Sequence, residues 1–172
     1  MEGDRTALVV GSGGPFREAI AGRLTALGYD VRSHPGDLAG MAPELVVAMP
    51  GTEDDHTFGT LDAAGWRTLL DGHLREPLDV CRAVVPRMVR VGRGTVILLV
   101  SAAASGLLEG RSYEAGAAGT IPGFAKSLAA EVAPAGVRVN VVRVPPSSAS
   151  AVDAAARLVA ETIELLARKG EF

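Results

Sequence analysis

The sequence predicts an α/β fold: a five-stranded parallel sheet in the strand order 2-1-3-4-5, with helices on both faces. Strand-like and helix-like segments alternate along the chain. The segment TVILLV at 95–100 is apolar on both faces, as a central parallel strand should be. Most segments between successive strands are long enough to hold a crossover helix. Residues 1–172 are therefore expected to form a single domain with three layers.

The first half of the chain is expected to hold three strands. TALVV at 6–10 is a β-rich run that ends in the glycine-rich GSGG. A helix begins at Pro15, which suits the first helical position, and its apolar residues recur on one face until Gly28 stops it. Two further strands are expected at 29–33 and 44–49, joined by a loop or a single helical turn.

The second half is expected to hold the two longest helices. Helical periodicity covers 61–91 with a break near Pro77, and 113–133 with a kink near Pro122, because proline interrupts helical hydrogen bonding. The remaining elements are a strand at 137–144 and a last helix at 150–169.

Composition and charge argue against several classes of function. The formal net charge is −3 and no Lys/Arg run is present, so nucleic-acid binding is not expected. No apolar signal segment opens the sequence and the longest apolar run is too short to span a bilayer, so no membrane association is expected. Cys81 stands alone, which excludes a disulfide framework and a cysteine-based metal site. These features predict a cytoplasmic protein without a metal.

The glycine-rich turn after the first strand is a candidate cofactor site. Gly11, Ser12 and Gly13 lie between a strand and a helix N-terminus, where backbone N–H groups favour a phosphate. Pro15 removes one of these donors. The turn therefore has two interpretations, a nucleotide-binding turn and a plain strand–helix connection, and both stay open.

Three segments carry a resemblance to a known family: DAAGWRTLLDGHLREPLDVCRAVVPRMV, GRGTVILLVSAAASG and SYEAGAAGTIPGFAKSLAAEVAPAGVRVN. They resemble the long central helix, the serine strand and the tyrosine helix of the short-chain dehydrogenase/reductase family. The match is most specific over 62–145. It implies a Rossmann-like three-layer sandwich and, for active members, an NAD(P)-dependent oxidoreductase.

Two of the family's four catalytic positions are kept. The family uses an Asn–Ser–Tyr–Lys set, and Ser101 and Tyr113 fall on its serine and tyrosine positions. His73 falls on the asparagine position and Ala117 on the lysine position. A free tyrosine titrates near about pH 10, and the family's lysine both lowers that pKa and binds the cofactor ribose. A methyl group does neither, and Lys126 is too far along the helix to replace the lysine, which leaves His73 as the only nearby candidate for a replacement cation.

Other departures lie around the family's cofactor and substrate. The Asn–Asn–Ala–Gly that follows a core strand in the family is AMPG at 48–51, and Val144–Pro145 replace a Pro–Gly. A helix and a strand of the family are missing before 44–49, and its substrate lid is missing after 137–144. The resemblance therefore indicates a truncated and degenerate member for which no cofactor is expected; NADP or NAD would be the cofactor of an active form.

Two classes of function remain open. One is a non-catalytic partner or scaffold, a pseudoenzyme, because the segments 62–91 and 113–133 match the helices through which family members form dimers. It would pair as a homodimer or as a heterodimer with an intact short-chain dehydrogenase/reductase subunit. The other is an enzyme: an NAD(P)H-dependent ketoreductase, with Ser101 holding a small-molecule carbonyl and Tyr113 donating the proton, or a cofactor-independent isomerase, dehydratase or cyclase with His73 as the base.

Overall fold

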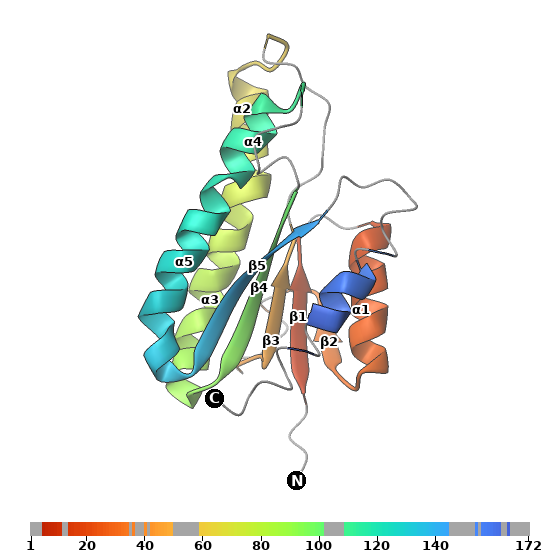
Figure 1. Ribbon diagram of the computed structural model, residues 1–172, viewed down its shortest axis with the longest axis vertical. Coiled ribbons are helices and arrows are strands. Elements are labelled where there is room, and N and C mark those ends of the chain that lie inside the picture. Colours follow the sequence, from red (N-terminus) through yellow and green to blue (C-terminus); the bar gives the residue numbers. More distant parts are fainter. Residues whose placement is uncertain are drawn as a thin grey trace.

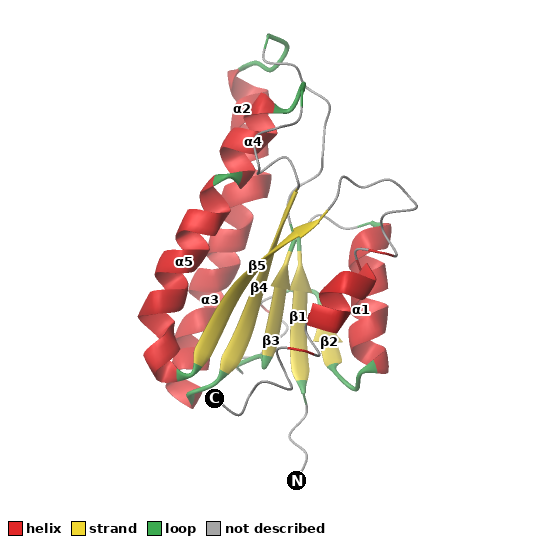
Figure 2. Cartoon of the chain, in the orientation of Figure 1, coloured by secondary structure: helices red, strands yellow, loops and turns green. Residues whose placement is uncertain are grey.

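A computed structural model describes residues 5–11, 14–34, 36, 40, 42–49, 59–101, 109–144, 154, 156–162 and 165. Its centre is a five-stranded parallel sheet in the order β2-β1-β3-β4-β5, flanked by helices on both faces (Figures 1 and 2). The predicted Rossmann-like architecture and strand order are therefore confirmed. The strands are β1 (Thr6–Val10), β2 (Asp30–Arg32), β3 (Leu45–Ala48), β4 (Gly94–Ser101) and β5 (Val137–Val144).

The helices form two layers. On one face of the sheet α1 (Pro15–Ala26) lies beside the helical residues 156–162, drawn in blue in Figure 1. On the other face the chain forms two long rods that lie side by side (Figure 1). The first rod is α2 (Ala63–Leu70), the π-helical turn η2 (Asp71–Arg75) and α3 (Glu76–Val91); the second is α4 (Ser112–Ala118), α5 (Thr120–Val132) and the 3₁₀ turn η4 (Ala133–Ala135).

Each helical layer packs on its own side of the sheet because alternate strand residues face opposite ways. In β1, for example, Leu8 belongs to the core under α3 and α5, whereas Val9 belongs to the core under α1. The predicted apolar face of α1 is confirmed, since Ile20 and Leu24 are buried there. Strand β4 is buried along its whole length, as its apolar sequence predicts.

Prolines account for the irregular turns in both rods. A proline has no N–H to donate, and its ring clashes with the carbonyl of the residue four positions earlier. For Pro77 that residue is His73, and the predicted break is observed as the π-helical turn around His73. For Pro122 that residue is Ala118, and the predicted kink is observed as the interruption between α4 and α5 at Gly119. Pro86 lies inside α3 without ending it.

The carboxyl ends of the strands meet at one edge of the sheet. The strand order reverses between β1 and β3, which is where open α/β sheets form their binding crevice. Val10 and Ala48 are paired at this edge, and Ser101 is paired with Val144 further along it. No helix within the described ranges is long and apolar enough to cross a membrane.

Candidate functional site

The two kept family positions lie near this edge. Ser101 is the last residue of β4 and is 1% exposed. Tyr113 is the second residue of α4 and is half-buried. Its ring packs against Trp66 of α2, with the ring centroids 5.1 Å apart and the planes tilted by 51°. The aromatic contact holds Tyr113 against the first helical rod.

The two replaced positions lie on η2 and α4, which are in contact. His73 is 3% exposed, and its Nδ1 atom has no hydrogen-bond partner. Ala117 is 0% exposed. At this position the protein therefore offers a packed methyl group and no charge. Lys126 is exposed on α5, beyond the interruption at Gly119.

Glu114 is a polar residue of this region that the sequence analysis missed. It is 3% exposed, and its Oε2 atom lies 2.8 Å from Nη1 of Arg111. Its Oε1 atom has no hydrogen-bond partner. One sequence signal could have indicated this ion pair. Arg111 and Glu114 are three residues apart at the start of a helix, and this spacing favours an ion pair.

The glycine turn after β1 has a structural reason for at least one of its glycines. Gly11 has a φ of +119°, and a Cβ atom there would lie 2.6 Å from the carbonyl oxygen of Met49. The close contact between the backbone at position 11 and Met49 therefore explains the glycine by itself, whether or not a ligand binds at the turn. Ser12 and Gly13, the other predicted cofactor-binding residues, lie outside the described residues, as do Pro50, Gly51 and Pro145.

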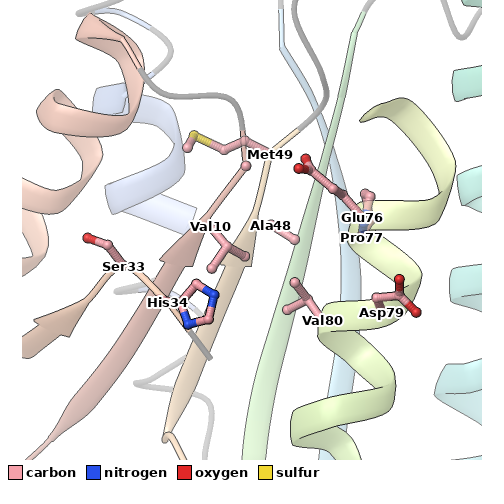
Figure 3. A pocket seen from close by; sticks show the side chains of 10 residues that line it. Val10, Ser33, His34, Ala48, Met49, Glu76, Pro77, Asp79 and Val80 are labelled. Carbon is pink, nitrogen blue, oxygen red and sulfur yellow. The ribbon is translucent and has the colours of Figure 1, made fainter. Parts of the chain in front are cut away.

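A cavity of about 350 Å³ opens at the ends of β1, β2 and β3 (Figure 3). Its position matches the crevice expected where the strand order reverses. It is lined by Val10, Gly11, Ser33, His34, Ala48, Met49, Glu76, Pro77, Asp79 and Val80. Strand ends thus form one wall and the first turns of α3 the other.

The charges around this cavity do not fit a dinucleotide. Two of the ten lining residues, Glu76 and Asp79, are carboxylates, and none is Lys or Arg. Arg32, at the end of β2, is held by the Asp30 carboxylate at 2.6 and 3.0 Å. The pyrophosphate of a dinucleotide is anionic, so it would be repelled by these carboxylates. We therefore derive no reaction step through NAD or NADP.

Metal and thiol chemistry gain no support from the described residues. They contain no group of three or more His, Cys, Asp or Glu that could hold a metal ion. Cys81 is buried in α3, and this burial raises the pKa of its thiol to about 11. The thiol is therefore protonated at neutral pH and is a poor nucleophile.

Comparison with known proteins identifies similar sequences. The family model for short chain dehydrogenases matches residues 44–158. The short-chain reductase protein NovJ of Streptomyces niveus is 33% identical over 129 residues, which cover 70% of this chain and 49% of NovJ. The chain thus spans about half the length of this curated relative.

Solved structures give the same result at the level of the fold. An oxidoreductase of the short-chain dehydrogenase/reductase family from Burkholderia thailandensis has a TM-score of 0.74 and 27% identity, covering 83% of this chain and 68% of its own. A metagenomic short-chain oxidoreductase in complex with NADP has a TM-score of 0.76 and 24% identity, covering 91% of this chain and 89% of its own. At that identity the second likeness concerns the fold alone.

Proposed function

The chain belongs to the short-chain dehydrogenase/reductase family, and we propose that within it the protein is a non-catalytic subunit that pairs with an intact short-chain reductase or with a second copy of itself. The observation that carries this proposal is the complete burial of Ala117 at the family's lysine position. A general acid works best with a pKa near the working pH, which for a tyrosine requires a neighbouring positive charge. Ala117 supplies none.

The cofactor side of the molecule supports the same proposal. The described residues that line the cavity at the ends of β1, β2 and β3 include two carboxylates and no Lys or Arg. Gly11 is explained by its approach to Met49. Hydride transfer needs a bound nicotinamide, so a chain that holds the dinucleotide poorly is a poor oxidoreductase even where Ser101 and Tyr113 are kept.

The two helical rods supply the proposed pairing surface, defined here as the outward faces of α3 and α5. They form the outermost layer on their side of the sheet (Figure 1). Val89 and Val91 of α3 are 39% and 55% exposed. On α5 the exposed residues Gly123 and Ser127 are small, which lets another helix approach closely. A reductase subunit is the proposed partner because the relative NovJ is a short-chain reductase.

Titration with nucleotides tests the catalytic half of the proposal. Calorimetric titration of the protein with NADH and with NADPH is expected to show no binding tighter than the millimolar range. An intact short-chain reductase titrated under the same conditions is the control. A micromolar dissociation constant for this protein would overturn the proposal, because it would show a working cofactor site.

A second candidate function is a cofactor-independent acid/base enzyme. The buried Nδ1 atom of His73, which has no hydrogen-bond partner, favours it, since an unpartnered imidazole nitrogen can accept a proton. Here Ser101 and Tyr113 would bind the oxygen of a small-molecule carbonyl. Tyr113→Phe distinguishes the two candidates: a subunit without catalysis supports its partner's activity unchanged, whereas an isomerase, dehydratase or cyclase loses turnover.

A further inference from the structure

We propose that the carboxylate of Glu76 is a specificity determinant that excludes anionic dinucleotides from the cavity at the ends of β1, β2 and β3. This inference rests on the proposed non-catalytic function and deepens it. It names the charge that would weaken cofactor binding at the edge of the sheet where this fold places a dinucleotide.

The location of Glu76 is the first step. It is the first residue of α3 and lines the cavity opposite the end of β3. In Figure 3 its carboxylate points toward Met49, across the mouth of the cavity. Gly11, where the turn after β1 begins, lines the same cavity. A pyrophosphate held at that turn would therefore lie across the cavity from the carboxylate.

The second step is that the charge of Glu76 is not compensated. Within the described part of the chain Glu76 takes part in no ion pair. Asp79, one turn further along α3, lies 3.6 Å from Arg75 and 3.9 Å from Arg82. Figure 3 also shows the Asp79 carboxylate pointing away from the centre of the cavity. Of the two lining carboxylates, Glu76 therefore dominates the potential that a ligand meets.

The third step is that the two basic side chains at the end of β2, Arg32 and His34, are already engaged. Arg32 is engaged by Asp30. The Nδ1 atom of His34, which also lines the cavity, accepts a hydrogen bond from the backbone N–H of Gly36 at 3.0 Å. Repulsion between Glu76 and a pyrophosphate a few ångströms away in a solvated cavity corresponds to about a threefold to tenfold loss of affinity.

The experiment is a titration with NADH, followed by ligand-observed NMR, at low and at high ionic strength. Glu76→Gln is expected to tighten NADH binding about threefold to tenfold at low ionic strength. Because the effect is electrostatic, salt should remove most of the gain. Asp79→Asn, whose carboxylate is already paired, should gain less, and Glu131→Gln, exposed at the far end of α5, should gain nothing.

This inference is overturned by no tightening in Glu76→Gln, or by a gain that Asp79→Asn or Glu131→Gln reproduces in full. A salt-independent gain would also overturn it, because it would indicate a change of shape. The proposed function fails separately. Micromolar binding of NADH by the wild type contradicts the proposed function, whatever the variants do. Equally weak binding by the wild type and all three variants contradicts only the role of Glu76.

Discussion

At the turn after β1, the backbone of Gly11 passes close to the end of β3. Its φ of +119° is unfavourable for other residues, and a Cβ atom would lie 2.6 Å from the Met49 oxygen and 2.9 Å from the Met49 Cβ. Both effects predict that Gly11→Ala lowers the free energy of unfolding, by about 2–4 kcal/mol in total. Urea denaturation followed by circular dichroism measures this loss.

Gly22→Ala is the matched control for that substitution. Gly22 lies within α1, where an added Cβ meets nothing within 4 Å. Alanine is the better helix former, so this variant should gain about 0.5–1 kcal/mol. If Gly11→Ala instead has the same urea midpoint of unfolding as the wild type, the turn has room for a side chain. The glycine then needs another explanation, such as a ligand.

At the scale of elements, the π-helical turn η2 places a polar side chain in the interior. The Nδ1 atom of His73 is buried without a partner, which costs about 1–3 kcal/mol relative to a satisfied or apolar group. His73→Leu is therefore expected to leave the free energy of unfolding unchanged or to raise it by about 1 kcal/mol. Chemical denaturation measures the change in the free energy of unfolding. The activity of the protein mixed with an intact short-chain reductase is measured in parallel.

Glu114→Gln provides the contrast. It removes the charge that pairs with Arg111, whose side chain is 19% exposed, so the free energy of unfolding is expected to fall by about 1–3 kcal/mol.

A loss of catalytic turnover in His73→Leu, with stability retained, would contradict the non-catalytic function and favour the acid/base enzyme. A large loss of stability in His73→Leu would show that the imidazole has a partner in solution.

Regular elements could be predicted from the sequence because their signals are local. The alternation of VRVNVVRV fixes β5 at Val137–Val144, the range predicted. The edge strand β2 is shorter than predicted, since only Asp30–Arg32 find partners on β1. Polar site residues could not be placed in the same way. The burial of His73 and Glu114 depends on how η2 packs against α4, and a helical pattern shows only that both residues are polar.

On the scale of the whole molecule, each face of the sheet is covered by its own helical layer (Figure 1). The sheet contributes one buried face to each layer, so each layer keeps one outward face. On the side of α3 and α5 that face carries exposed valines and small residues. Under the proposed non-catalytic function, such a surface would favour association with a second subunit. Association is therefore the property that a whole-molecule experiment should measure.

Gly123→Arg tests the pairing surface without disturbing the fold. Gly123 is exposed on α5, and an added Cβ meets nothing within 4 Å, so the variant should fold as well as the wild type. An arginine there would keep a second helix from approaching to about 8–10 Å.

Sedimentation velocity measures the association, with the protein alone and mixed with an intact short-chain reductase. The wild type is expected to form dimers or heterodimers, and Gly123→Arg is expected to stay monomeric. Gly22→Arg, equally open on α1 but on the opposite face of the sheet, should pair normally. A wild type that stays monomeric at high concentration with and without the reductase would rule out pairing, and unchanged assembly of Gly123→Arg would place the interface elsewhere.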